Sequence, residues 1–297
     1  MPFLKKAPDS HGFAAIGALA DIGGMCDCES LAIKESSLMR YCLPLLLVSL
    51  LGAAASRPAA ADMQVRLPHV VWREVEFEHN GLITFGPKGT ASDRAQSYTN
   101  SIASGVTPWW KIELEGEMTS GGGQHLVWAA TTFENTFALT ERGQYMFDVG
   151  FFAEYSQATG LAPNEVKFGP ILHKEVLNVF GSGIDTAHTL NIFFSRDVGG
   201  NATRRTGLNV AWQSVARFHP WSASVLAPGF EYYANIEDFS HAGSYNQQKH
   251  FVGPVLTGTQ SFSPYGKLKY QVGYLFGLSN ASPKGAVRWK LEYEISF

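Results

Sequence analysis

Apolar and polar residues alternate along most of the chain, and the alternation is strictest at the C-terminal end. Between Val287 and Phe297 every second residue is apolar, and charged or polar residues fill the positions between them. A period of two residues is typical of a β-strand with one apolar and one polar face. The sequence therefore predicts a final strand that stays apolar to its last residue.

The same pattern recurs across residues 62–297, and no long segment shows the 3.6-residue period of an amphipathic helix. Alternating runs bounded by turn residues predict an all-β fold of about twelve strands, at 72–85, 96–106, 109–118, 125–139, 144–157, 164–177, 186–198, 206–218, 223–236, 247–260, 266–278 and 286–297.

The predicted connections alternate in length. Short ones lie at 106–109, 139–144, 217–222 and 261–266. Longer ones, rich in Gly, Ser and Asn, lie at 119–125, 156–165, 196–207, 236–248 and 277–286. Residues 177–186 depart from this alternation, because they are too many for a tight turn. The pattern predicts a transmembrane antiparallel up-and-down β-barrel with short periplasmic turns, longer extracellular loops and both termini on the periplasmic side.

Aromatic residues gather beside the predicted short turns: Trp109, Trp110, Tyr145, Trp221 and Tyr265. Tryptophan and tyrosine are enriched where a barrel crosses the membrane–water interface. We therefore expect these residues to form an aromatic girdle at one end of the barrel.

Composition narrows the class further. Charged residues make up 16% of the chain, below the roughly 25% of ordinary globular proteins. The net charge of −3 gives no sign of a nucleic-acid partner. The cysteines Cys26, Cys28 and Cys42 all precede residue 62, so the rest of the chain has no disulfide framework and no thiol chemistry.

The N-terminal region divides into two segments. From Met39, a basic residue, an apolar run over 43–55 and three alanines ending at Ala61 form the pattern of a secretory signal peptide, so we predict a signal over 39–61 and cleavage near Ala61–Asp62. The apolar run is shorter than the ~20 residues of a spanning helix, although an internal anchor or buried helix remains an alternative. Residues 1–38 fit no signal pattern, and we interpret them as a disordered upstream over-annotation.

Taken together, the predicted signal, the cysteine-free even-stranded region 62–297 and its terminal Phe resemble the outer-membrane β-barrels of Gram-negative bacteria. Residues 106–117, 133–156 and 266–285 are also similar to an uncharacterised proteobacterial barrel family with no known activity. The resemblance implies secretion through the inner membrane, contact with outer-membrane lipid, and recognition by the barrel assembly machinery through Trp289, Leu291, Tyr293, Ile295 and Phe297.

A soluble fold is the alternative. A secreted β-sandwich or lipocalin-like barrel shows the same alternation with its apolar face turned inward. Periodicity alone does not separate the two arrangements.

No catalytic motif of a hydrolase, a nucleotide-binding enzyme or a metalloprotease is present, so we predict neither an enzyme nor a catalytic residue. A hydrolase that uses Asp238, Ser240 and His241 of one long loop is a minor alternative. The nine histidines show no ligand spacing, and we predict no metal and no cofactor.

The informative polar residues are those expected on the inner face of the barrel. We predict a lumen lined by Lys111, Glu113, Glu115, Asp148, Glu154, Lys167, Lys249, Lys269, Arg288, Lys290, Glu292 and Glu294. Charges of both signs must be hydrated or paired, because an unpaired buried charge is costly. A water-filled lumen predicts a porin-like channel for passive diffusion of small solutes, whereas an ion-paired lumen predicts a plugged structural barrel.

Overall fold

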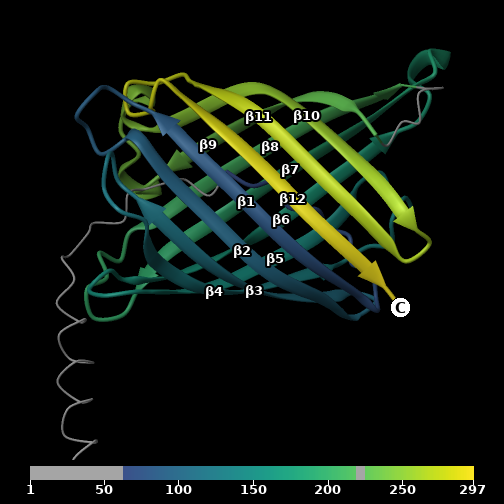
Figure 1. Ribbon diagram of the computed structural model, residues 1–297, viewed down its shortest axis with the longest axis horizontal. Helices are drawn as coiled ribbons and strands as arrows, with labels where there is room; N and C mark the ends of the chain where they lie inside the picture. Colours follow the sequence, from purple (N-terminus) through teal and green to yellow (C-terminus); the bar gives the residue numbers. More distant parts are fainter. Residues whose placement is uncertain (1–62, 219–224) are drawn as a thin grey trace, which may run out of the picture. The chain divides into compact units, whose positions relative to one another are not determined.

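Twelve antiparallel strands close into a single barrel in the computed structural model, which describes residues 63–218 and 225–297 (Figure 1). The predictions for 1–38 and 39–61, and the position of Trp221, lie outside the described residues. The strands are β1 (Glu74–Phe85), β2 (Asp93–Thr107), β3 (Trp110–Ser120), β4 (Val127–Ala138), β5 (Asp148–Ala158), β6 (Asn164–Val176), β7 (Ile184–Val198), β8 (Thr206–Phe218), β9 (Ala227–Ile236), β10 (Lys249–Ser263), β11 (Gly266–Gly277) and β12 (Gly285–Ser296).

Each strand pairs with its neighbours in the sequence, and β12 closes the barrel against β1. The register of this seam runs from Glu74 opposite Ser296 to Phe85 opposite Gly285. The predicted all-β barrel of about twelve strands is confirmed. The start of two strands was placed too early, since β5 begins at Asp148 instead of residue 144 and β9 at Ala227 instead of residue 223.

The two ends of the barrel differ less than the sequence predicted. We call the end where β1 begins and β12 ends the turn end, and the opposite end the loop end. Tight turns at 108–109 and 264–265 lie at the turn end, but the connections 139–147 and 177–183 also lie there. These two are at least as long as 86–92 or 199–205 at the loop end, where 237–248 is the longest connection. The contrast between short turns and long loops is therefore weaker than expected.

The barrel is polar inside and apolar outside. Glu231 and Arg288 are only 0% and 3% exposed, whereas Leu114 is 53% exposed. The same inversion holds around the barrel, where exposed apolar side chains include Phe77, Ile102, Phe133, Phe168, Phe230, Val272, Phe276 and Leu291. A soluble barrel or sandwich buries its apolar face, so this distribution excludes the soluble alternative.

Among the described residues, no helix has the length and the apolar character that crossing a membrane requires. The helical elements described are short 3-10 turns, at Val179–Gly181, Phe239–His241 and Tyr245–Gln247.

The outer face of β12 is the predicted recognition signal. Leu291, Tyr293 and Ile295 are exposed, and Trp289 lies over Gly81 of β1. A Cβ atom at Gly81 would lie 2.1 Å from the Trp289 ring, so this glycine makes room for the indole at the seam. The Phe297 side chain is exposed, and its backbone N–H donates to the Arg73 carbonyl oxygen. Recognition of this strand by the assembly machinery stays a prediction.

The apolar exterior gives a first test. Leu114 lies near the middle of β3, so Leu114→Arg should place a charge in lipid and lower the free energy of unfolding by about 2–4 kcal/mol. Leu139→Arg is the matched control, because Leu139 lies in the connection after β4, where the same charge should cost about 0–1 kcal/mol. The measurement is reversible urea unfolding in lipid vesicles. Equal effects of the two substitutions would show that the exterior of β3 does not face lipid.

Candidate functional site

Residues 63–72 precede β1 and run through the barrel lumen to the turn end, where Val71 and Trp72 are exposed, and we call them the lumen segment. Met63 belongs to a buried cluster with residues of β1 and of β8 to β12. Arg66, three residues later, contacts β4, β5 and β7. β4 and β5 lie across the closed barrel from β10, β11 and β12, which supply Phe251, Leu275 and Ala286 to the cluster. The segment therefore crosses the lumen from one wall to the other.

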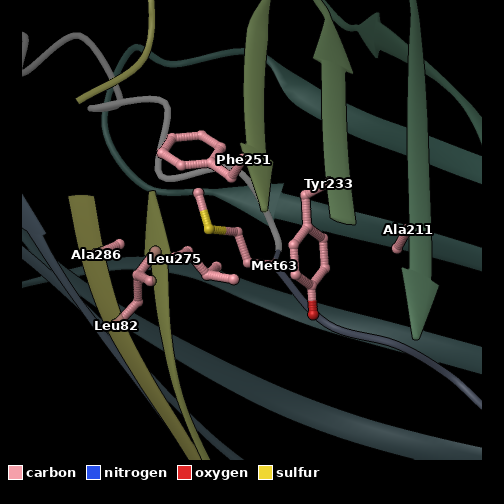
Figure 2. Packing of buried hydrophobic residues seen from close by; sticks show 7 residues of the cluster. All are labelled: Met63, Leu82, Ala211, Tyr233, Phe251, Leu275 and Ala286. Carbon is pink, nitrogen blue, oxygen red and sulfur yellow. The ribbon is translucent and has the colours of Figure 1, made fainter. Parts of the chain in front are cut away.

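Met63 anchors one end of the segment in an apolar socket. Figure 2 shows its side chain among six wall residues: Leu82, Ala211, Tyr233, Phe251, Leu275 and Ala286. Val65 packs against the same cluster. Met63 is 6% exposed, and burying such a side chain contributes about 1.5–3 kcal/mol. The socket is an apolar patch in a polar interior, and it lies toward the loop end because Leu82 and Ala286 are near that end of β1 and β12.

Arg66 holds the middle of the segment through polar contacts. Its backbone N–H donates to Asn191 Oδ1 at 2.7 Å, and its carbonyl oxygen accepts from Asn191 Nδ2 at 2.9 Å. Its guanidinium pairs with Glu134, lies 3.8 Å from Glu154, and stacks 4.5 Å from the Phe152 ring centroid. Charge-assisted bonds and a cation–π contact thus fix one arginine to three strands.

The segment then reaches the turn end. A Cβ atom at Gly150 of β5 would lie 2.7 Å from Pro68 Cβ, so the absence of a side chain there leaves room for the segment. His69 Nε2 lies 2.9 Å from Asp148 Oδ2. Trp72 bridges to Gly105 of β2, and Arg73 takes a left-handed backbone conformation (φ 63°) before β1 begins. The segment therefore runs through the lumen from the loop end to the turn end.

Most of the predicted lumen residues form ion pairs between nearby strands. Lys111 of β3 lies 2.7 Å from Glu76 of β1, and Lys167 of β6 lies 2.9 Å from Glu154 of β5. Other pairs are Lys269 with Glu292 at 2.8 Å and with Glu294, Lys290 with Glu292 at 2.8 Å and with Glu78, and Lys249 with Glu237 at 2.7 Å. Glu113 accepts a bond from the Ser101 hydroxyl, and Glu115 is buried. The structure thus brings both charge signs together, and their role as the lining of a solute path stays a prediction.

Arg288 makes a pair with a longer reach. Its guanidinium, on β12, binds Glu231 of β9 and the Tyr233 hydroxyl, the latter at 2.7 Å. The Glu231 carboxylate also accepts from Gln213 at 2.6 Å and from Gln271. This network joins strands that are not neighbours, because β10 and β11 lie between β9 and β12.

Sequence analysis left several partners of this interior out of the predicted lumen: Glu74, Glu76, Glu78 and Glu134. Glu74, Glu76 and Glu78 follow a period of two in the first strand, and that period was the signal that could have found them. Arg66 precedes every predicted strand, so no periodicity pointed to it.

A cavity of about 620 Å³ lies beside the start of the lumen segment and extends from mid-barrel residues such as Glu134 and Glu154 to the loop end. Met63 and Gln64 form part of its wall. Charged residues of both signs also line it, including Glu117, Glu165, Arg196, Asp197, Arg205 and Glu237. A second cavity, beside Tyr233 and Phe251, measures about 20 Å³. A small solute therefore has space at the loop end.

The minor hydrolase site is a capped turn. The Asp238 carboxylate accepts from the Ser240 backbone N–H at 3.1 Å, and His241 Nδ1 lies 3.3 Å from the same carboxylate. An aspartate at this position satisfies the free N–H groups of a short helical turn. Turn capping accounts for this arrangement without a catalytic role.

Of the predicted girdle residues, Trp109, Trp110, Tyr145 and Tyr265 lie at the turn end. Trp109, Tyr145 and Tyr265 are exposed there, and the near-parallel rings of Trp109, Trp110 and Phe137 lie 6.2–6.4 Å from one another. The Trp110 indole N–H donates to Asn135 Oδ1 at 3.0 Å. Contact of these rings with the membrane interface stays a prediction.

One grouping differs from the sequence analysis. His69, Asp148 and His173 lie far apart in the sequence, yet their potential ligand atoms all lie within 4.8 Å of one another. A second cluster, Glu74, Glu76 and Glu294, is already paired with lysines. The fold thus brings together His69 and His173, which no spacing in the sequence connects.

No protein-family model matches this chain, and no curated protein matches it. Among solved structures, the KdgM porin in complex with disordered oligogalacturonate is 10% identical with a TM-score of 0.43, over 75% of this chain and 99% of that one. An outer membrane channel from Pseudomonas putida F1 is 14% identical with a TM-score of 0.48, over 80% of this chain and 98% of that one. The NanC porin is 11% identical with a TM-score of 0.44, over 74% of this chain and 100% of that one.

At these identities and TM-scores, the likenesses identify neither a family nor a solute. The chain's own features decide its class: a closed barrel with an even number of antiparallel strands, an apolar exterior and a charged interior. The protein has the architecture of an outer-membrane β-barrel. Such a barrel satisfies its backbone hydrogen bonds within lipid, and the architecture places the protein in the bacterial outer membrane.

The Arg288 network gives a second test. Arg288→Met leaves the Glu231 carboxylate buried without its cation and should lower the free energy of unfolding by about 3–5 kcal/mol. The double variant Arg288→Met with Glu231→Gln should recover most of this loss, because no uncompensated charge remains. Lys249→Met is the control, since its partner Glu237 is exposed and the expected loss is about 0–1 kcal/mol. Urea unfolding measures all three variants. An Arg288→Met variant as stable as the wild type would contradict the buried pair.

Proposed function

We propose that the protein is an outer-membrane channel for small polar solutes, and that residues 63–72 close it in the described conformation. The observation that carries the proposal is the position of the lumen segment. It crosses the interior of a barrel whose strand ladder is complete without it. A closing element of this kind can move aside without breaking a strand pair.

The contacts of the segment suit a reversible closure. One methionine enters an apolar socket, and one arginine forms polar bonds with wall residues. Water can replace each of these polar bonds when the segment leaves. The backbone hydrogen bonds of the barrel are unaffected, because the segment joins the sheet only through the isolated bridge between Trp72 and Gly105.

The wall charges support a polar path behind the segment. Pairs such as Lys167 with Glu154 and Lys269 with Glu292 join adjacent strands, so they run along the wall. A lining of both signs gives weak selectivity, whereas a lining of one sign selects ions of the opposite charge. The mixed charges of the cavity at the loop end favour small polar solutes in the same way.

The second candidate is a structural barrel with a permanently ion-paired lumen. The Arg288–Glu231 network favours it, because it reaches across two intervening strands. The two candidates differ in what happens once the lumen segment is removed. A third function, hydrolysis by the 237–248 loop, has less support, because the capped turn accounts for Asp238 and His241.

Deletion of residues 63–71 from the chain that starts at Asp62 is the decisive experiment. We expect the deletion variant to give discrete conductance steps in planar bilayers, because the lumen segment no longer crosses the interior of the barrel. The intact chain should conduct rarely and in brief openings. A gel shift between unboiled and boiled samples checks that both barrels are folded, and silence of a folded deletion variant would favour the ion-paired structural barrel.

A reversible lock tests the same motion in the intact chain. Pro68→Cys with Gly150→Cys places two thiols at a close contact, since a Cβ atom added at Gly150 would lie 2.7 Å from Pro68 Cβ, and the segment must move outward by about 1 Å to reach the separation of about 3.8 Å in a disulfide. The chain from residue 62 has no other cysteine. The oxidised protein should lose its voltage-induced openings, and a reducing agent should restore them. Each single-cysteine variant is the control, and openings that persist with the disulfide verified by mass spectrometry would show that the segment is not the gate.

A further inference from the structure

The turn end of the lumen holds a group of metal-binding side chains drawn from three parts of the chain. His69 belongs to the lumen segment, Asp148 begins β5, and His173 lies on β6. His69 Nε2 is 2.9 Å from Asp148 Oδ2, and the two imidazole rings meet edge to face with centroids 4.8 Å apart. Each residue offers one ligand atom, and these atoms all lie within 4.8 Å of one another.

One nitrogen of this group is buried without a partner. His173 is 3% exposed, and its Nδ1 lies 2.9 Å from Thr189 Oγ1. Its Nε2 has no hydrogen-bond partner, and the nearest carboxylate oxygen, of Glu175, is 3.9 Å away. An unsatisfied buried polar atom is costly, so its presence calls for a ligand or another physical reason. The bond to Thr189 also fixes the ring, as the outer-shell partners of metal-binding histidines do.

We propose that His69, Asp148 and His173 bind a divalent transition metal, with Zn²⁺ as the best fit. Two imidazole nitrogens and one carboxylate form a donor set that suits Zn²⁺, with a water molecule in the fourth position. Ligand bonds of roughly 2.0–2.2 Å require the three side chains to close around the ion by small rotations. The metal then replaces the hydrogen bond between His69 and Asp148.

The charges around the group permit this binding. Arg142 and Arg217 are the nearby cations, and both pair with Glu175, at 2.8 Å and 3.2 Å. The Asp148 carboxylate also accepts from the Gly143 backbone N–H at 2.7 Å, through its other oxygen, and the Oδ2 atom remains directed at His69. The bound ion fastens the lumen segment to β5 and β6, so the metal acts as a latch. This latch rests on the proposed channel function, whereas metal binding itself does not.

Cobalt absorption tests the site. The probe is Co²⁺, titrated into the folded chain that starts at Asp62, prepared without a histidine tag. We expect one Co²⁺ per chain, visible absorption bands of tetrahedral cobalt, and displacement of the cobalt by Zn²⁺. His69→Ala and His173→Ala should each weaken binding by at least about tenfold, since loss of even an outer-shell partner costs 10–100-fold.

Two controls keep the result interpretable. His188→Ala removes an imidazole that binds Ser214 on the other face of the sheet, so it should leave cobalt binding unchanged. His69 lies outside the strands, so His69→Ala should fold even if His173→Ala does not, and the gel shift verifies folding. Absence of cobalt binding, or full binding by folded His69→Ala and His173→Ala, would overturn the proposal.

Conductance then tests the latch. Zn²⁺ should suppress the openings of the intact chain, a chelator should restore them, and His69→Ala should be insensitive to the metal. Metal binding without any change in the frequency of channel openings would overturn the latch, whereas the proposal of a metal site would stand. Silence of the deletion variant would reject the channel function, and the cobalt result would still stand by itself.

Discussion

The structure depends on one constraint: within a lipid bilayer, every backbone N–H and C=O group must find its partner inside the protein. A sheet meets this constraint only when its first and last strands pair, as β1 and β12 do along the whole of β1. Closure then decides where the side chains go. Alternate residues face lipid and are mostly apolar, and those between them face the lumen and are mostly polar or charged, apart from the socket of Met63.

The charged interior creates a second requirement, because carboxylates and ammonium groups in a narrow lumen must be paired or hydrated. Neighbouring strands supply pairs along the wall, such as Lys167 of β6 with Glu154 of β5. The lumen segment supplies Arg66, which meets Glu134 and Glu154 where the wall is acidic. The segment therefore has two roles besides occupying space. It brings one cation to two glutamates, and it inserts Met63 into an apolar cluster of wall residues. The contacts of Arg66 that hold the segment in the lumen therefore also neutralise part of the lumen's negative charge.

The sequence predicted the fold well, because a period of two is a local signal and it recurs in every strand. β8 has the predicted bounds of 206–218. The start of β5 was predicted too early because the alternation continues through Tyr145 and Phe147. In the structure, hydrogen bonds that two side chains accept from the backbone set where the strand begins. Asp148 accepts from the Gly143 N–H, and the Val149 N–H donates to Thr140 Oγ1, so the chain turns before it extends.

The candidate site was less predictable, because its contacts join residues far apart in the sequence. Arg66 meets Asn191, and His69 meets His173, and no spacing within one strand announces such pairs. The inward residues were predicted from the alternation within each strand. The lumen segment was missed because it belongs to no strand. Its Pro68 could have marked the segment as separate from the strands. Nothing in the sequence indicates that the segment lies in the lumen.

The most direct test of this account is the accessibility of Met63 in the folded protein. A Met63→Cys variant of the chain that starts at Asp62 has one thiol, and a bulky maleimide reagent reports whether that thiol is shielded within the lumen. Leu161→Cys, in the exposed connection after β5, is the reference. The account predicts that the thiol at position 63 reacts orders of magnitude more slowly than the thiol at 161, and that unfolding removes the difference. Equal rates in the folded barrel would contradict it, because they would place the segment outside the lumen.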